Sequence, residues 1–229
     1  QNMILPFNDE EEKIYVANLA KANKKLQELY DIEGSDKMQI LKLLTRLRQL
    51  CLEPRLVYDN IDQPSSKLKA CMELIKTMQE NKQKVLLFSS FTSVLDLIAE
   101  ECQKAGITYY MLTGSTNKED RRELVSRFQK DDTTLFLISL KAGGTGLNLT
   151  SAEVVIHFDP WWNVSAQNQA TDRAYRIGQK NNVQVFNLVM KDSVEEKIIE
   201  LQKRKKELAD MFVENNSGGL SQMSKEDIL

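Results

Sequence analysis

The sequence predicts an α/β protein in which helices cover both faces of a parallel sheet. The main observation is that short β-rich runs alternate with helical segments, which is the pattern of right-handed βαβ units. Parallel strands joined in this way normally form a sheet buried on both faces. The second observation is size, because a chain of 229 residues, 41% of them hydrophobic, can bury a substantial core.

Five strands are expected from the β-rich runs, at residues 85–89, 108–112, 134–139, 154–158 and 183–189. Helices are expected to begin near Ser66, Ser93, Thr116, Ser165 and Ser193. Thr116 with Glu119, and Ser193 with Glu196, have capping-box spacing, in which a hydroxyl accepts a hydrogen bond from a first-turn amide. These two pairs therefore mark helix starts.

Two amphipathic helices are expected before the α/β region. Apolar side chains recur at spacings of three and four residues between 11 and 30, and again between 40 and 51. The polar stretch 58–66, which contains Pro64, is typical of a connector. The chain is therefore divided into a helical part at 1–63, an α/β domain at 64–192, and a C-terminal helix and tail at 193–229.

Composition narrows the classes of function. The formal net charge is -2, so any nucleic-acid surface must be a local patch. Cys51, Cys71 and Cys102 are widely spaced in apolar surroundings, which favours buried thiols in a reducing compartment and no metal site. No apolar run approaches the roughly 20 residues that span a bilayer. Residues 9–12 are acidic where a secretory signal would be basic, so we expect an intracellular protein.

One candidate ligand loop follows the expected strand at 134–139. It reads LKAGGTG at 140–146, and glycines at 143, 144 and 146 permit positive φ and close approach of the backbone to a phosphate or sugar. Ligands of open parallel sheets bind beyond the carboxyl ends of the strands, where this loop lies. A tight turn without a ligand is the alternative interpretation.

A second candidate segment, at 169–179, reads QATDRAYRIGQ. Arg173 and Arg176 are three residues apart on an expected helix, so both guanidinium groups can lie on one face. Two permanent cations at this spacing suit an anionic γ-phosphate, because guanidinium forks match phosphate oxygens. The alternative is a solvated helix face on which Asp172 pairs with a neighbouring arginine.

The sequence contains no GxxxxGK followed by Ser or Thr, which is the P-loop pattern. Its Asp-Glu run, at 9–12, opens a helix instead of ending a buried strand, so no magnesium-binding carboxylate box is expected. A phosphate-clamping face without a P-loop implies that another domain supplies one.

Along almost its whole length the chain resembles the C-terminal half of the SWI/SNF-like branch of superfamily 2 helicases and translocases. The segments that carry the resemblance are 43–56 (LLTRLRQLCLEPRL), similar to the stretch between the lobes; 84–91 (KVLLFSSF), similar to motif IV; 110–116 (YMLTGST) with Arg122 and Phe128; 137–152 (LISLKAGGTGLNLTSA), similar to motif V; 155–163 (VIHFDPWWN); and 169–179, similar to motif VI. Residues 193–205 resemble the family's brace helix.

The resemblance implies a RecA-like lobe between an inter-lobe helical linker, or protrusion, and a brace helix. It implies that Arg173 and Arg176 are arginine fingers that reach the γ-phosphate of ATP, supported by Gln169. Gly144 and Gly146 would line the nucleotide side of the cleft. ATP and Mg²⁺ would be held mainly by a first lobe, so the full-length protein would be a DNA-dependent ATPase and this lobe alone would be inactive.

The same resemblance implies contacts with the phosphates of double-stranded DNA from Thr113, Gly114 and Lys141, with Trp162 at the DNA surface. One of the two adjacent tryptophans, Trp161 and Trp162, is expected to be part of the core. The implied partners are duplex DNA, the N-terminal RecA-like lobe and DNA-bound proteins, with no membrane partner. The implied location is at DNA, in a nucleoid or nucleus.

Three positions depart from the family pattern. Val164 stands where proline is usual, Tyr175 replaces a common histidine, and Glu53 replaces the histidine before Pro54. None of these changes removes a phosphate-contacting arginine. His157 lies on an expected buried strand, which favours a hydrogen-bonded core residue over a catalyst.

Two other functions remain open. The first is a non-catalytic RecA-like module that binds DNA or protein, which would need no arginine pair. The second is a self-contained nucleotide-sugar or dinucleotide enzyme that uses the loop at 141–146. That enzyme would require a glycine-rich loop after its first strand, and residues 90–93 contain no glycine.

Overall fold

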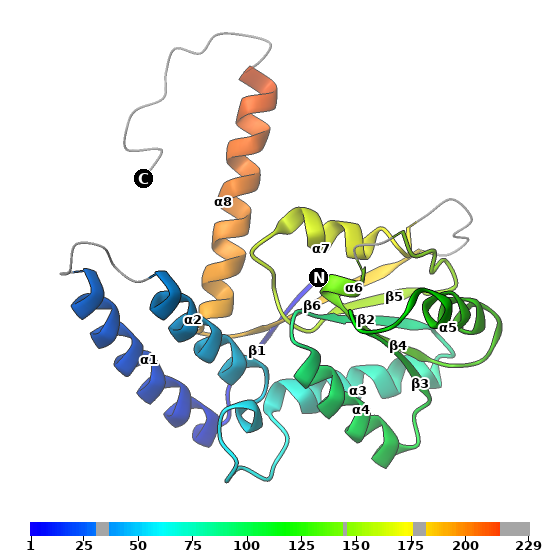
Figure 1. The fold of residues 1–229 in the computed structure, drawn as a ribbon, viewed down its shortest axis with the longest axis horizontal. Helices are drawn as coiled ribbons and strands as arrows, with labels where there is room; N and C mark the ends of the chain where they lie inside the picture. Colours follow the sequence, from blue (N-terminus) through cyan, green and yellow to red (C-terminus); the bar gives the residue numbers. More distant parts are fainter. Residues whose placement is uncertain (31–36, 144–145, 176–181, 216–229) are drawn as a thin grey trace.

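The structure is a computed structural model that describes residues 1–30, 37–143, 146–175 and 182–215. The described strands form a six-stranded parallel sheet with helices on both faces (Figure 1). The strands are β1 Asn2–Leu5, β2 Val85–Ser89, β3 Tyr109–Leu112, β4 Leu135–Ser139, β5 Val154–His157 and β6 Gln184–Met190. Their order across the sheet is β1-β6-β5-β2-β4-β3, and every neighbouring pair is parallel. The predicted fold class is therefore confirmed.

The helices are α1 Asp9–Tyr30, α2 Lys37–Leu52, α3 Ser66–Glu80, α4 Thr92–Ala105, α5 Lys118–Lys130, α6 Leu140–Gly143, α7 Val164–Thr171 and α8 Val194–Asn215, with a 3-10 turn, η1, at Pro54–Leu56. The predicted starts of α3, α4, α7 and α8 lie within one residue of the observed ones. The five predicted strands also match to within one residue at each end.

The central strands are buried on both faces. Every residue of β2, β4 and β5 is buried. Because successive side chains of a strand point to opposite faces, Leu87 and Ile156 join the core under α3 and α4, whereas Phe88 and Val155 join the core under α5 and α7. The sheet is thus the middle layer of three.

The two predicted caps have different outcomes. Ser193 caps α8, since its hydroxyl accepts a hydrogen bond from the Glu195 amide at 3.1 Å. The predicted cap at Thr116 is wrong: α5 begins at Lys118, and the Asn117 side chain accepts from the Asp120 amide at 2.8 Å. The Thr116 hydroxyl instead accepts from the Thr113 amide at 3.1 Å, so it closes the turn before the helix.

The first residues of the chain form a strand that the sequence analysis did not anticipate. Residues 1–63 were expected to be helical, but β1 pairs with β6 in the register Asn2 to Asn187 and Leu5 to Met190. β1 has only four residues, too few for a clear periodicity, and the exposed edge of β6 supplies its hydrogen-bonding partners. The division of the chain at residue 63 stays a prediction.

Helices α1 and α2 run side by side beside the sheet, as predicted from their periodicity (Figure 1). A third core lies between them and the start of α8, and its buried members are Tyr15, Ala22, Leu47, Leu50, Cys51 and Met190. The connector before α3 is fixed by two carboxylates. Glu53 accepts from the Ser65 amide at 2.9 Å, and Glu11 accepts from the Ser66 amide at 2.6 Å. Glu53 also pairs with Arg55, so the departure at this position has a structural role.

A buried ion pair joins α3 to α8. The Lys67 ammonium donates to both carboxylate oxygens of Glu195 at 2.7 and 2.8 Å, and the two side chains are 0% and 1% exposed. Glu195 also accepts from the Met190 amide at 2.8 Å, at the end of β6. Burial raises the pKa of the Glu195 carboxyl, while the neighbouring Lys67 opposes that rise.

His157 attaches α7 to the sheet. Its ring is buried at the end of β5, stacks on Phe88, and lies 2.9 Å from the Thr171 hydroxyl through Nε2. Burial lowers the pKa of the ring from its ordinary value near 6.5 to about 4. His157 is therefore the hydrogen-bonded core residue that the sequence predicted.

The cysteines, the absence of a membrane-spanning helix and the absence of a metal cluster were three expectations from composition. Cys51, Cys71 and Cys102 are buried free thiols, as predicted. Within the described ranges, no helix combines the length and apolarity needed to cross a membrane. The same part of the chain contains no group of three or more His, Cys, Asp and Glu side chains arranged to hold a metal ion.

Lys67→Met is expected to lower the free energy of unfolding by about 3 to 5 kcal/mol, because it leaves the Glu195 carboxylate buried without its cation. The double variant Lys67→Met/Glu195→Gln should recover most of this loss, since the amide can still accept from Met190 and no charge remains. Denaturant unfolding measures both. Arg204→Ala, which breaks the exposed pair with Glu200, is the control and should cost at most about 1 kcal/mol. An equal loss in Lys67→Met and Arg204→Ala would contradict the role of the buried pair.

His157→Gln is expected to make the protein less sensitive to acid. Below pH 6.5 the unfolded chain binds a proton on His157 before the folded chain does, so wild-type stability falls as the pH drops towards 4. A pKa shift of this size corresponds to about 3 kcal/mol in the free energy of unfolding. The wild-type protein should lose this stability at low pH, whereas the variant should keep it. Denaturant unfolding at a series of pH values measures the difference between the two proteins. Parallel curves between pH 7 and pH 4 would show that His157 does not titrate in this way.

Candidate functional site

The loops that follow the strands gather at one edge of the sheet, called here the carboxyl edge. All six strands are parallel, so the segments after β2, β3, β4 and β5 leave the sheet on the same side. Thr113 and Gly114 follow β3, Lys141 follows β4, and Trp162 lies in the loop after β5. The topology therefore brings the sequence-predicted DNA contacts to a common edge.

The glycine-rich segment begins with the single helical turn α6. Lys141 is exposed on this turn. Gly146 has a φ of +49°, and a Cβ added there would meet no atom within 4 Å, so the backbone conformation requires glycine while the space around it is open. Gly144 lies outside the described residues.

The arginine-bearing segment differs from its predicted conformation. We expected Arg173 and Arg176 on one helix, but α7 ends at Thr171, and Arg173 lies in the turn that follows. The amides of Arg173 and Ala174 donate to carbonyls three residues earlier, as in a tight turn. The Arg173 carbonyl accepts from the Leu149 amide at 3.2 Å, and Leu149 lies three residues after the glycine-rich loop at 140–146.

This contact ties the arginine-bearing segment to the chain just after the glycine-rich loop. The side chain of Arg173 is buried, with 7% of its surface exposed, and its backbone is tied to Leu149. Arg176, the second predicted finger, lies outside the described residues. Gln169 is exposed near the end of α7. Tyr175, at the position of a common histidine, donates its hydroxyl to the Val183 carbonyl at 2.8 Å.

The turn after β3 is closed by its own side chains. The Thr113 amide donates to Thr116, and the hydroxyls of Thr113 and Ser115 lie 2.8 Å apart. The Thr113 amide is therefore already engaged inside the turn. Gly114 and Ser115 are the exposed residues of this turn.

The two tryptophans divide as predicted. Trp161 is partly buried and packs against the core under α5 and α7, whereas Trp162 is 40% exposed. The backbone of Trp161 is held on both sides. Its amide donates to Gln167 at 3.3 Å, and its carbonyl accepts from Gln202 of α8.

A surface hollow of about 650 Å³ lies beside Gly146. Three basic side chains of α5, Lys118, Arg121 and Arg122, contribute to its lining. Arg121 also donates to the Ala142 carbonyl at 3.1 Å, which connects α5 to α6. Sequence reasoning singled out only Arg122 of the three, although their spacing of three and four residues on one helix was a usable signal.

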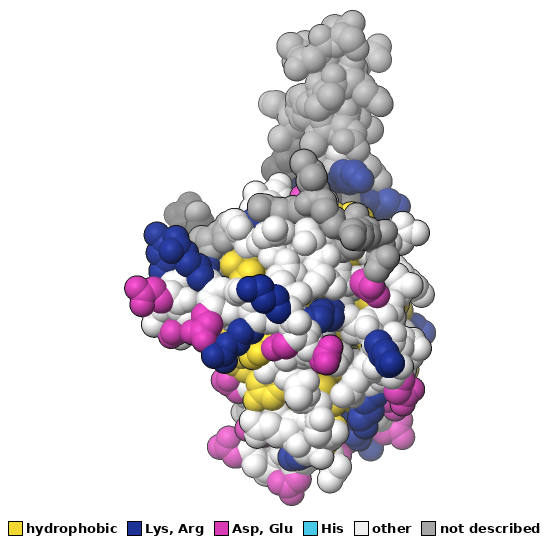
Figure 2. Space-filling model, turned by 90° about the vertical axis from the view of Figure 1, so that its right-hand side faces the viewer, with side chains coloured by type: hydrophobic (Ala, Val, Ile, Leu, Met, Phe, Trp, Pro, Cys, Tyr) yellow, Lys and Arg dark blue, Asp and Glu magenta, His cyan; other side chains and the backbone are white. Residues whose placement is uncertain are grey.

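The basic residues of this side of the molecule do not form a separate patch. Figure 2 shows the face that carries α5 and β3, and Lys and Arg side chains are interspersed there with Asp and Glu. This agrees with the formal net charge of -2. Any contact of this face with a polyanion must therefore depend on individual cations.

A second network at the carboxyl edge was missed by sequence reasoning. Asp159 is 1% exposed and accepts from the Ser89 hydroxyl at 2.7 Å, the Ser90 amide at 3.1 Å and Arg48 Nη2 at 3.0 Å. The Ser90 hydroxyl contacts the same carboxylate. Arg48 comes from α2, and its position in the segment between the lobes gave no sign of this partner.

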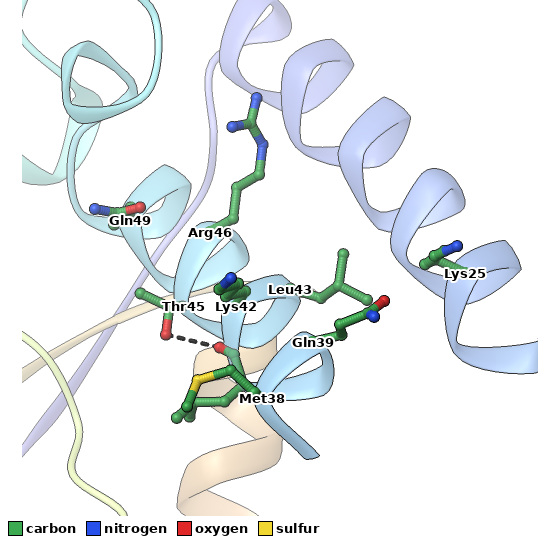
Figure 3. Close-up of a pocket in the computed structure, with 9 residues that line it drawn as sticks. Lys25, Met38, Gln39, Lys42, Leu43, Thr45, Arg46 and Gln49 are labelled. Atoms are coloured by element: carbon green, nitrogen blue, oxygen red, sulfur yellow. Dashed lines mark hydrogen bonds between the residues drawn. The ribbon is translucent and has the colours of Figure 1, made fainter. Parts of the chain in front are cut away.

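Another hollow, of about 600 Å³, lies away from the sheet (Figure 3). Its lining comes mainly from α2, with Lys25 contributed by the neighbouring α1. None of its residues follows a strand of the sheet. Because the candidate groups lie at the carboxyl edge, this hollow is not part of the candidate site.

Comparison with known proteins agrees with this arrangement. Residues 66–178 match the model of the helicase conserved C-terminal domain. An uncharacterized ATP-dependent helicase of Mycoplasma pneumoniae is 35% identical over 229 residues, which cover 100% of this chain and 22% of that protein. The chain therefore spans about a fifth of the length of this relative.

Two solved structures from Sulfolobus solfataricus share the fold. The SWI2/SNF2 ATPase C-terminal domain has a TM-score of 0.74 and 27% identity, over 90% of this chain and 85% of that one. The SWI2/SNF2 ATPase core in complex with double-stranded DNA has a TM-score of 0.76 and 31% identity, over 91% of this chain and 44% of that one. The sheet, the helicase domain and these relatives together show that this chain belongs to the SWI/SNF-like helicases as their C-terminal, RecA-like lobe.

Proposed function

We propose that this chain is the second motor lobe of an ATP-dependent translocase on double-stranded DNA. In this role Arg173 and Arg176 act as arginine fingers on ATP held by a first lobe, while the loops of the carboxyl edge hold the DNA backbone. The observation that carries the proposal is the attachment of Arg173 to Leu149, just after the glycine-rich loop at 140–146, in a sequence without a P-loop. ATP chemistry at this edge therefore requires phosphate-binding groups from elsewhere.

The arginine residues of this lobe can supply positive charge to such a site. Guanidinium groups neutralise the charge that spreads over the phosphoryl oxygens during transfer. Gly146 adds an exposed backbone segment that a nucleotide can approach closely, and Gly144 and Gln169 are the other residues that we assign to this side. Mg²⁺ would be bound by the first lobe together with the phosphates.

Lobe closure would depend on a change at Arg173. The side chain is buried in this lobe, so its guanidinium must turn outwards to reach a phosphate on a facing lobe. A contact made only when the γ-phosphate is present supplies the differential interaction that a conformational switch needs. Closing on ATP and opening after hydrolysis would then move the two lobes relative to each other along the duplex.

The proposed DNA contacts are Thr113, Gly114, Lys141 and Trp162. The exposed Lys141 can pair with a phosphate, and the exposed faces of Gly114 and Trp162 can lie against the backbone. The Thr113 amide is occupied by Thr116, which leaves the Thr113 hydroxyl as the polar group for a phosphate. A similar ATPase core has been solved with duplex DNA, which supports this class of partner.

Arg173→Ala and Arg176→Ala should each lower DNA-stimulated ATP turnover by about 10³-fold or more in the protein that joins this lobe to its P-loop lobe. Steady-state hydrolysis at saturating ATP and DNA measures the effect. Arg127→Ala is the control, because Arg127 is an exposed arginine paired with Glu123 on α5, and its turnover should stay unchanged. Undiminished turnover in both finger variants would exclude the assignment. The isolated lobe should hydrolyse no ATP in the same assay.

Lys141→Ala should weaken binding of duplex DNA by a similar factor for all sequences and reduce the salt dependence of log K by about 1, because one phosphate contact is lost. Titration of DNA at several salt concentrations measures both quantities. Lys104→Ala removes an exposed lysine that lies on α4, before the amino end of β3, and serves as the control. An unchanged salt slope in Lys141→Ala would remove this residue from the DNA surface.

A further inference from the structure

The loop between β5 and α7, residues 159–163, is called here the support loop. It begins at the buried Asp159, whose two carboxylate oxygens are both occupied. Oδ1 accepts from the Ser89 hydroxyl and the Ser90 amide, and Oδ2 accepts from Arg48 and the Ser90 hydroxyl. Ser89 is the last residue of β2 and Ser90 follows it, so Arg48 is the partner that comes from another element, α2.

Arg48 is held in a defined position. Its guanidinium lies 5.0 Å from the centroid of the Phe91 ring, and Nη2 donates to the Ser90 hydroxyl at 2.8 Å as well as to Asp159 at 3.0 Å. The side chain is 14% exposed, so solvent screens this pair only weakly. A planar fork that stacks on a ring and bonds to two acceptors cannot be reproduced by lysine.

The support loop has a second attachment from outside the sheet. Gln202 of α8 donates to the Trp161 carbonyl and to Gln167 Oε1, the latter at 3.2 Å. Gln167 in turn accepts from the Trp161 amide and donates to Asn187 of β6 at 3.3 Å. The loop and the middle of α7 thus form one hydrogen-bonded unit, held by α2 at its start and by α8 at its centre.

This unit leads directly to Arg173. α7 has only eight residues, and its last residue, Thr171, is tied to His157 of β5. Arg173 follows two residues later. A shift of the support loop would therefore be carried along a short, hydrogen-bonded helix to the arginine-bearing turn.

We propose that Arg48 is a positioning residue for ATP hydrolysis: through Asp159 it fixes the support loop and thereby the placement of Arg173 towards the nucleotide. This inference rests on the proposed finger role of Arg173. Arg48 itself touches neither the nucleotide nor the finger. Its position on α2 means that the helical segment between β1 and β2 sets the geometry of the catalytic edge.

The test uses the complete ATPase, in which this lobe is joined to its P-loop lobe, assayed with duplex DNA well below the unfolding midpoint of each variant. Arg48→Ala should lower kcat by roughly 10- to 100-fold, the size of effect expected from a small misplacement of a catalytic group. The KM for ATP should change little, because the first lobe binds most of the nucleotide. Arg48→Lys should recover only part of kcat, since lysine keeps the charge without the fork.

Arg55→Ala is the matched control. Arg55 is 15% exposed and pairs at 3.0 Å with the buried carboxylate of Glu53, so it resembles Arg48 in burial and in charge, but its partner lies outside the support loop. In a thermal melt, Arg55→Ala should lose about as much stability as Arg48→Ala, but its kcat should stay unchanged. Equal effects of Arg48→Ala and Arg55→Ala on kcat would reduce Arg48 to a structural role and overturn the proposal.

Asp159→Asn tests whether Arg48 acts through Asp159. It also replaces Arg48→Ala as the test variant if Arg48→Ala folds poorly. If Arg48 acts through Asp159, the double variant Arg48→Ala/Asp159→Asn should have the kcat of Asp159→Asn alone, whereas independent effects would multiply and contradict the route. Arg173→Ala in the same assay separates the two proposals. Full turnover in Arg173→Ala would reject the finger assignment, whereas impaired turnover there with normal turnover in Arg48→Ala would reject only the positioning role.

Discussion

The buried pair between Lys67 and Glu195 connects the elements on which the rest of the lobe depends. Lys67 comes from α3, Glu195 from the first turn of α8, and the same carboxylate accepts from the amide of Met190 at the end of β6. The Lys67 ammonium also lies 5.3 Å from the ring of Phe158, the residue before the support loop. Two charges with almost no exposure are tolerated only when their hydrogen-bonding capacity is satisfied. This requirement fixes the helices and both strand ends relative to one another.

Because this ion pair fixes α8 and the strand ends, the carboxyl edge lies between two rigid elements, α2 and α8. The carboxyl edge is formed by loops, but its most important loop is held at Asp159 by α2 and at Trp161 by α8. α2 lies between β1 and β2 in sequence, and α8 follows β6. Both helices therefore contact the same edge as the motifs, which gives them a structural role at that edge.

The candidate site contains two kinds of residue: buried residues that are held by hydrogen bonds, and exposed residues that a ligand can reach. Arg173 and Asp159 are buried and bonded, whereas Lys141, Gly114 and Trp162 are exposed. The proposed finger, Arg173, starts from a defined buried position, and it would have to leave that position to reach a phosphate. Residues that hold a DNA backbone without reading sequence need only accessible charge and surface.

The sequence alone determined the parallel sheet, the strand limits to within one residue, the buried histidine and the family, because these depend on local periodicity and ordered motifs. Tertiary structure decided the rest. β1 became a strand because β6 offered it an edge, and the turn after α7 is held by the Leu149 amide, which donates to the Arg173 carbonyl. The link from Arg48 to Asp159 spans 111 residues, and no local pattern encodes a hydrogen bond between side chains so far apart in sequence. Such contacts arise only when the packed cores bring the ends of β2 and β5 beneath α2.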